Sequence, residues 1–270
     1  MTTPAVGIAL AQFAPGPDPQ ENAAAIAAYA EEAAARGAGV LVAPEYSSYF
    51  VTPFDGTLPA HAEPLDGPFA ARLAGIAAET GVTIVAGLVE EAPGDRVRNA
   101  VIAVDGSGVR ATYRKQHLYD AFGERESDHI EPGALGAPET FVVGGLRFGL
   151  MTCYDLRFPE SARILADAGV DVAVVPAEWV RGPLKEFHWE TLVAARAIEN
   201  TMFVAAADHP APVGVGASRL ADPSGVTIAA LGPGPGLAMG WADREAIAAV
   251  RAANPALALR RYRVVAAPSS

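Results

Sequence analysis

Residues 147–157 read Arg-Phe-Gly-Leu-Met-Thr-Cys-Tyr-Asp-Leu-Arg, an apolar segment that ends at a cysteine and gives way to a polar one. Open α/β sheets place their sites just beyond the carboxyl ends of strands, which is the position this pattern predicts for Cys153. Backbone N–H groups after such a residue can donate to an oxyanion. A lone cysteine is, however, more often a small buried hydrophobe than a nucleophile, so Cys153 needs support from the rest of the chain.

Segments of two kinds alternate on both sides of this stretch. Apolar periodicity, Gly stops and turn residues predict helices and strands. The helices are expected over residues 19–36, 66–80, 159–168, 184–200 and 243–252, and the strands over 6–13, 40–43, 82–90, 99–104, 109–113, 147–152, 170–175 and 202–207. Hairpins are indicated around residues 105–108, 144–145 and 225. This interleaving predicts an α/β layered fold with mixed sheets.

A single domain over residues 1–270 is expected, because the length suits one large core and no linker interrupts it. The Gly-Pro run 232–236 is interpreted as a loop inside that domain. Half of the residues are apolar and 19% are charged, a globular composition. No apolar run is long enough to span a bilayer, and the first nine residues lack the features of a secretory signal, so a cytoplasmic location is the expectation.

The charge and the cysteine count exclude several classes of function. A formal net charge of −11 argues against a nucleic-acid binder, which needs a basic excess. One cysteine and five histidines without HxxxH or HExxH spacing make a metal site improbable. No GxxxxGK[ST] or complete GxGxxG is present, so no nucleotide, flavin or other cofactor is expected.

Two charged residues share the position of Cys153 at a strand end. Glu45 follows the apolar segment 40–44, where desolvation would raise the pKa of a carboxyl and make it a usable base. Lys115 follows the predicted strand 109–113. Taken singly, Glu45 is equally well a loop cap and Lys115 is more commonly a solvated lysine. Because strand ends in one sheet can converge, a Glu–Lys–Cys cluster is geometrically reasonable.

Lysine is rare in this chain. Of its twenty basic residues only Lys115 and Lys185 are lysine, and the rest are arginine. Composition bias alone explains an occasional lysine. A compact ammonium nevertheless fits a tight pocket that a planar guanidinium would overfill.

These motifs together resemble the nitrilase superfamily of carbon–nitrogen hydrolases, across nearly the whole chain. The resemblance rests on Pro44-Glu45, on residues 113–118 around Lys115 (Tyr-Arg-Lys-Gln-His-Leu) and on residues 153–160 after the cysteine (Cys-Tyr-Asp-Leu-Arg-Phe-Pro-Glu). Further matches follow in family order at Glu126-Ser127, Pro132-Gly133, 176–179, 196–200, 216–218 and 222–225. No single short match is specific for this family, but this many matches in the family's order are specific for it.

The resemblance implies a four-layer α-β-β-α sandwich and a Glu–Lys–Cys triad. In that mechanism Cys153 attacks the substrate carbon, Glu45 moves the protons, and Lys115 with the N–H of Tyr154 stabilises the oxyanion. Many family members use a second glutamate; the spacing to Ser127 and Pro132-Gly133 favours Glu126, and leaves Glu124 as a solvated loop charge.

The other residues of these motifs are expected to line the pocket or to support the catalytic residues. The side chain of Trp179 is expected to pack in the core, and Trp179 is also a candidate for lining the substrate pocket. Glu178 departs from the small residue expected there; if it faces the cavity, its charge should disfavour anionic substrates. His117 is expected to be hydrogen-bonded scaffold. Ion pairs are expected among Asp155, Arg157 and Glu160, and among Arg196, Glu199 and Asn200.

The leading functional prediction is an amidase that acts on a small amide. Residues 115–133 most resemble the branch of ω-amidase-like and deaminated-glutathione-amidase-like enzymes. N-carbamoyl amino acid hydrolysis and aliphatic nitrile hydrolysis are alternatives, since they use the same triad. A catalytically silent scaffold of the same fold is the non-enzymatic alternative, which the intact triad disfavours. The resemblance also suggests a homodimer or a higher homo-oligomer.

Overall fold

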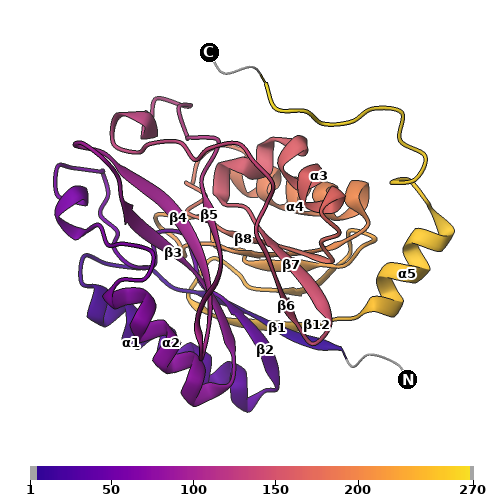
Figure 1. The fold of residues 1–270 in the computed structure, drawn as a ribbon, viewed down its shortest axis with the longest axis horizontal. Coiled ribbons are helices and arrows are strands. Elements are labelled where there is room, and N and C mark those ends of the chain that lie inside the picture. Colours follow the sequence, from indigo (N-terminus) through magenta and orange to yellow (C-terminus); the bar gives the residue numbers. More distant parts are fainter. Residues whose placement is uncertain (1–4, 268–270) are drawn as a thin grey trace.

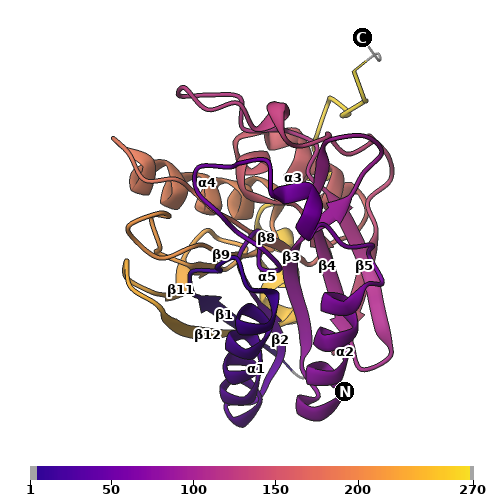
Figure 2. The same cartoon turned by 90° about the vertical axis from the view of Figure 1, so that its left-hand side faces the viewer.

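The computed structural model describes residues 5–267. Two six-stranded sheets lie face to face, and helices cover their outer faces (Figures 1 and 2). The first sheet has the order β12 (Gly236–Ala242), β1 (Val6–Gln12), β2 (Ala38–Val42), β3 (Thr83–Glu91), β4 (Val97–Asp105), β5 (Gly108–Arg114). The second has the order β11 (Thr227–Ala230), β10 (Arg219–Ala221), β9 (Phe203–Ala207), β8 (Val172–Pro176), β7 (Leu146–Leu150), β6 (Thr140–Val143).

Both sheets are mixed. Their centres are parallel, β1-β2-β3 in the first sheet and β7-β8-β9 in the second, and antiparallel strands flank each centre. The central strands read as continuous apolar runs because both of their faces are covered. The predicted four-layer α-β-β-α sandwich with two mixed sheets is confirmed.

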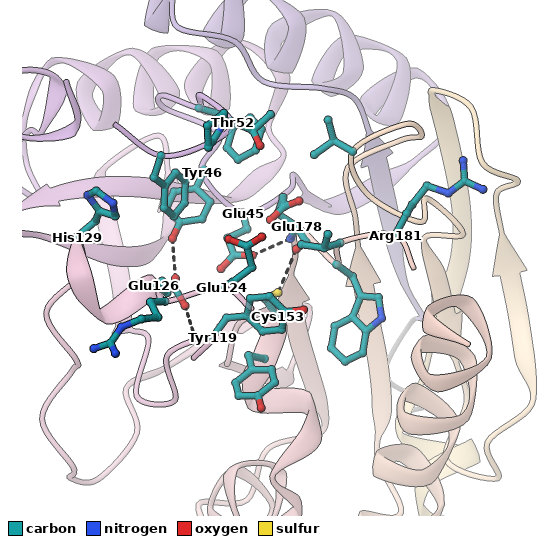
Figure 3. Close-up of a pocket in the computed structure, with 18 of the residues that line it drawn as sticks. Glu45, Tyr46, Thr52, Tyr119, Glu124, Glu126, His129, Cys153, Glu178 and Arg181 are labelled. Atoms are coloured by element: carbon teal, nitrogen blue, oxygen red, sulfur yellow. Dashed lines mark hydrogen bonds between the residues drawn. The ribbon is translucent and has the colours of Figure 1, made fainter. Parts of the chain in front are cut away.

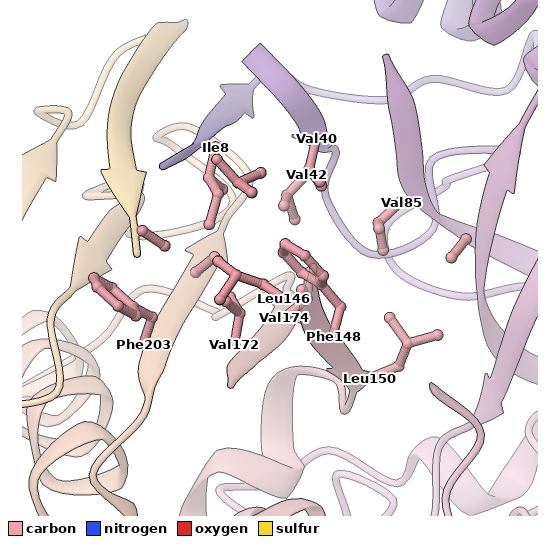
Figure 4. Close-up of a cluster of buried hydrophobic side chains, with 14 of the residues drawn as sticks. Ile8, Val40, Val42, Val85, Leu146, Phe148, Leu150, Val172, Val174 and Phe203 are labelled. Carbon is pink, nitrogen blue, oxygen red and sulfur yellow. The ribbon is translucent and has the colours of Figure 1, made fainter. Parts of the chain in front are cut away.

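Three apolar layers hold the sandwich together. The inner layer fills the space between the sheets with side chains such as Ile8, Val42, Phe148 and Val174 (Figure 4). The first sheet packs its other face against α1 (Pro19–Ala35) and α2 (Pro68–Thr80). The second sheet packs against α3 (Pro159–Asp167) and α4 (Lys185–Asn200). None of the helices within residues 5–267 is long and apolar enough to cross a membrane.

The predicted helices are all present, with ends shifted by one or two residues. Side chains and glycine fix these ends: Asp18 caps the first turn of α1, and Asp243 caps α5 (Arg244–Ala253). Gly81 ends α2 with φ of 73°, a left-handed conformation that glycine adopts without strain.

One strand escaped prediction. β12 pairs antiparallel with the full length of β1 and forms the edge of the first sheet. Its sequence, Gly-Leu-Ala-Met-Gly-Trp-Ala, contains no β-branched residue, so propensity does not mark it as a strand. The alternation of large and small side chains was its only local signal.

Candidate active site

Three strands of the two sheets deliver Glu45, Lys115 and Cys153 to one cavity. Glu45 lies three residues beyond β2, Lys115 directly follows β5, and Cys153 lies three residues beyond β7. The cavity has a volume of about 550 Å³, and all three residues line it. Figure 3 shows Glu45 and Cys153 among the lining residues. Within residues 5–267, no group of three His, Cys, Asp or Glu side chains is arranged to hold a metal ion.

The Lys115 ammonium lies between two carboxylates. Its Nζ is 2.9 Å from Oε1 of Glu45 and 2.9 Å from Oε2 of Glu126, and all three side chains are buried. Burial opposes the charged ammonium, but the carboxylates of Glu126 and Glu45 outweigh it and raise the pKa of Lys115 well above its usual value. The charged ammonium is therefore the favoured form of Lys115.

Glu126 is held from three sides. Its Oε1 accepts hydrogen bonds from the hydroxyl of Tyr46 at 2.6 Å and from Nδ2 of Asn99 at 3.2 Å, and its Oε2 accepts one from the N–H of Tyr119 at 2.6 Å. Glu124 is exposed, although it also borders the cavity. Of the two candidate glutamates, the structure thus brings Glu126 to Lys115.

Glu45 is also fixed by neighbours distant in the sequence. Nδ2 of Asn99 donates to its Oε1 at 2.6 Å, and the N–H of Glu178 donates to its Oε2 at 2.6 Å. The carbonyl oxygen of Glu45 lies 2.8 Å from Nε2 of His209. Burial lowers the pKa of His209 to about 4, so the ring is neutral near pH 7 and Nε2–H is the donor.

Cys153 begins a 3-10 turn, η3 (Cys153–Arg157), with φ of 44°. This left-handed conformation is uncommon for a residue other than glycine and is found mainly where a site requires it. A capping box between Thr152 and Asp155 holds the turn. The thiol donates to the carbonyl of Glu178 at 3.4 Å, and burial, with the carboxylate of Glu45 as second cause, raises the pKa of Cys153 well above its usual value. The neutral thiol is thus the favoured form of Cys153.

Glu178 and Trp179 line the cavity beyond β8. Trp179 is also packed against Trp189, with ring centroids 5.4 Å apart, so it belongs to the hydrophobic core as well as to the cavity lining. Burial, with Glu45 and Asp208 as further causes, raises the pKa of Glu178 well above its usual value. The neutral acid is therefore favoured, and the repulsion of anionic substrates expected from its charge is weakened. Tyr154 also lines the cavity, next to the nucleophile.

The ion pairs predicted among Asp155, Arg157 and Glu160 are wrong. Asp155 is buried and bonded to Nδ1 of His117 at 2.7 Å, which confirms His117 as scaffold. Arg157 makes no ion pair among residues 5–267 and instead lines the cavity. Glu160 is exposed. Charged side chains close to a core were expected to pair with one another. Arg157 instead faces the cavity and stacks against the ring of Trp179.

The second predicted cluster is confirmed in part. Arg196 pairs with Glu199 at 2.8 Å and donates to the carbonyl of Leu156 at 3.0 Å, which ties α4 to the nucleophile turn. Asn200 donates to the carbonyl of Arg196.

Sequence reasoning missed four residues that hold the site: Tyr46, Asn99, Tyr119 and His209. Asn99 left a signal, since a buried amide in the apolar strand β4 needs polar partners. The other three act from loops, where their partners cannot be deduced from spacing.

Sequence comparisons relate the chain to known hydrolases. The sequence model of the carbon–nitrogen hydrolases matches residues 7–252. A deaminated glutathione amidase of Escherichia coli O157:H7 is 44% identical over 202 residues, 74% of this chain and 76% of that protein. A hydrolase of Mycobacterium tuberculosis is 39% identical over 262 residues, 90% of this chain and 91% of that protein.

Solved structures agree with these relatives. An amidase from Nesterenkonia sp. AN1 has a TM-score of 0.81 at 29% identity and covers 95% of this chain and 96% of its own. A variant of that amidase shows acrylamide added at its active-site cysteine, with 29% identity, a TM-score of 0.78 and coverage of 94% and 100%. From the family match and these relatives together, the chain belongs to the carbon–nitrogen hydrolases of the nitrilase superfamily.

Proposed function

We propose that this chain is an amidase that hydrolyses a small amide through a thioester on Cys153. The observation that carries the proposal is the buried Glu45–Lys115 ion pair, which opens on the same cavity as the thiol. A base, a fixed positive charge and a nucleophile are the three elements that acyl transfer from an amide requires. The amidases among its relatives support the same assignment.

Acylation uses all three groups. The Glu45 carboxylate takes the Sγ proton while Sγ attacks the carbonyl carbon of the amide. Negative charge then develops on the carbonyl oxygen, where the Lys115 ammonium and the N–H of Tyr154 stabilise it. The tetrahedral intermediate collapses when Glu45 returns the proton to the nitrogen, the C–N bond breaks, and ammonia or an amine leaves.

Deacylation repeats the proton transfers in reverse order. Glu45, again a carboxylate, takes a proton from a water molecule that attacks the thioester carbon. The carbon–sulfur bond then breaks, Cys153 recovers its proton, and a carboxylic acid is released. Glu126 orients the Lys115 ammonium throughout, as their 2.9 Å contact suggests.

The test is ammonia release from a substrate panel by the unmodified protein and by Cys153→Ala. The panel contains ω-amides, deaminated glutathione, N-carbamoyl amino acids and aliphatic nitriles. We expect turnover of amides that Cys153→Ala loses, together with stoichiometric alkylation of Cys153 by iodoacetamide. Turnover confined to N-carbamoyl compounds or nitriles would replace the amide assignment, and an inert Cys153 with no turnover would indicate a silent scaffold.

A further inference from the structure

Asn99, a buried amide in strand β4, joins the two carboxylates that flank Lys115. It is 1% exposed, and its Nδ2 donates to Oε1 of Glu45 at 2.6 Å and to Oε1 of Glu126 at 3.2 Å. Nζ of Lys115 donates to the same two oxygen atoms, at 2.9 and 3.0 Å. The backbone carbonyl of Asn99 also accepts the N–H of Lys115 at 2.8 Å. Two nitrogen donors, one charged and one neutral, thus bridge one pair of carboxylate oxygens.

The amide of Asn99 is held in one orientation, and this orientation is not the one that serves stability best. Its Oδ1 is buried and has no hydrogen-bond partner among the described residues. A buried carbonyl oxygen without a partner is unfavourable, so stability alone does not account for an asparagine here. The opposite orientation would turn Oδ1 toward two carboxylate oxygens, which would repel it. Both hydrogens of Nδ2 are therefore committed to Glu45 and Glu126.

The two carboxylate oxygens of Glu45 consequently have different surroundings. Oε1 accepts hydrogen bonds from Lys115 and Asn99, which occupy both of its lone pairs. Within residues 5–267, Oε2 accepts a single hydrogen bond, from the N–H of Glu178 at 2.6 Å, and keeps one lone pair. A proton can therefore be accepted at Oε2 without the loss of a hydrogen bond, whereas at Oε1 it would displace a donor.

The backbone of Glu178 brings Oε2 of Glu45 and the thiol of Cys153 together. The N–H of Glu178 donates to Oε2, and its carbonyl oxygen accepts from Sγ at 3.4 Å, so both reacting atoms contact the same residue (Figure 3). Burial is the largest cause of the raised pKa of Cys153, and a hydrogen bond with the Glu45 side chain is among the others. The thiol is therefore within reach of the carboxylate, on the side of Oε2.

We propose that Oε2 of Glu45 is the atom that takes the Sγ proton, and that Asn99 is a positioning residue that reserves Oε2 for this step. As the proton moves, the S–H bond breaks, an O–H bond forms at Oε2, and the thiolate sulfur bonds to the substrate carbon. Asn99 holds Oε1 turned away, so that the carboxylate does not rotate. This inference rests on the proposed function only in taking Glu45 as the base of Cys153.

The position of Asn99 separates its effect on rate from any effect on binding. Glu45 and Cys153 line the cavity, whereas Asn99 is not part of the lining, as far as residues 5–267 define it. A substrate in the cavity therefore contacts Glu45 but not Asn99. Loss of the Asn99 amide should slow proton transfer and leave the binding of the substrate unchanged.

Acylation of Cys153 by p-nitrophenyl acetate tests the inference, because this activated ester acylates a thiol whatever the natural substrate is. The burst of p-nitrophenolate measures the step in which Glu45 takes the proton. Asn99→Leu keeps a similar side-chain volume but donates no hydrogen bond. We expect its maximal burst rate to fall by about 10- to 100-fold, the range for the loss of a hydrogen bond to a charged group, and its half-saturating ester concentration to change by less than about 2-fold.

Asn200→Leu is the matched control. Asn200 is also a fully buried asparagine whose Oδ1 has no partner among the described residues, and its Nδ2 donates to the carbonyl of Arg196, in helix α4. This variant loses a comparable hydrogen bond and should keep the burst rate of the unmodified protein. An equal fall in the Asn99 and Asn200 variants would show a general effect on the fold and would overturn the inference.

A second measurement follows the bridge itself. In protein grown with isotope-labelled asparagine, the two Nδ2 protons of Asn99 should resonate downfield of those of the exposed Asn254 in NMR spectra. Glu45→Gln and Glu126→Gln should each shift mainly a different one of these two protons. Protons that neither substitution shifts would overturn the inference.

The burst and amide turnover together distinguish this inference from the proposed function. A burst rate that Asn99→Leu leaves intact would remove this inference alone, while amide turnover by the unmodified protein continues. Absence of amide turnover with a burst that still depends on Asn99 would remove the proposed function alone. A protein whose Cys153 gives no burst would overturn the inference as well, because no proton would then leave the thiol for Glu45.

Discussion

The neutral thiol of Cys153 makes the role of Glu45 measurable. Burial and the Glu45 carboxylate both raise the thiol pKa, so removal of that negative charge should lower it. For Glu45→Gln we expect the rate of alkylation by iodoacetamide to reach its midpoint at a lower pH than in the unmodified protein. Amide turnover at neutral pH should fall by about 10²- to 10⁴-fold, because the base is lost.

The matched control is Glu124→Gln, which neutralises an exposed carboxylate on the rim of the same cavity. It should shift neither the midpoint nor the turnover. A midpoint for Glu45→Gln that stays in place or moves to higher pH would show that Glu45 does not set the thiol pKa.

At the scale of the residue, the meeting of Glu45, Lys115 and Cys153 at one cavity was predictable, and the residues that hold them there were not. Glu45, Lys115 and Cys153 each follow an apolar strand, a pattern visible in one sequence. Arg157 was expected to pair with a neighbouring carboxylate, because sequence spacing does not show that it faces a cavity. Contacts such as that of Asn99 with Glu45, 54 positions apart, depend on the register between strands and loops.

The element that positions Glu45 is strand β3, through a close backbone approach at Gly87. The N–H of Gly87 donates to the carbonyl of Pro44, and a Cβ at Gly87 would lie 2.3 Å from the backbone nitrogen of Tyr46. Gly87→Ala must therefore displace the loop that carries Glu45. We expect turnover to fall by about 100-fold, because a small misplacement of a catalytic group has an effect of this size. The free energy of unfolding should fall by about 1–3 kcal/mol, because the added methyl group overpacks the contact.

Gly75→Ala is the control for this element. A Cβ at Gly75 meets nothing within 4 Å, and the residue lies inside α2. That variant should keep full turnover and gain about 0.5–1 kcal/mol of stability in urea unfolding. Gly87→Ala with the turnover of the unmodified protein would mean that the Glu45 loop tolerates displacement.

Elements with strong local signals were predicted closely. Capping residues and glycine stops gave the helices to within two residues, and Gly-containing turns gave the hairpins. β12 was missed because its partner, β1, lies more than 220 positions away, and pairing with that strand replaces the missing propensity. Edge strands of this kind are defined by the sheet they join.

Over the whole molecule, the inner apolar layer joins the two sheets, and the cavity takes its Glu45, Lys115 and Cys153 from both. Glu45 and Lys115 follow strands of the first sheet, whereas Cys153 follows a strand of the second. The α-β-β-α order was implied by the family resemblance; alternating helices and strands alone predicted only mixed sheets in layers. Residues 1–270 as a single domain stay a prediction, as do the homodimer and the cytoplasmic location.

Phe148→Ala tests whether the sheets form one cooperative unit. Phe148 is fully buried between them, and its truncation should cost about 3–5 kcal/mol of stability. In a single unit, hydrogen exchange followed by mass spectrometry should show protection falling together in β3 and β8, the centres of the two sheets. Val142→Ala, at an exposed position of β6, should change stability by less than about 0.5 kcal/mol. Loss of protection confined to β8 would mean that the sheets unfold separately, so that Cys153 could leave Glu45 and Lys115 while the first sheet stays folded.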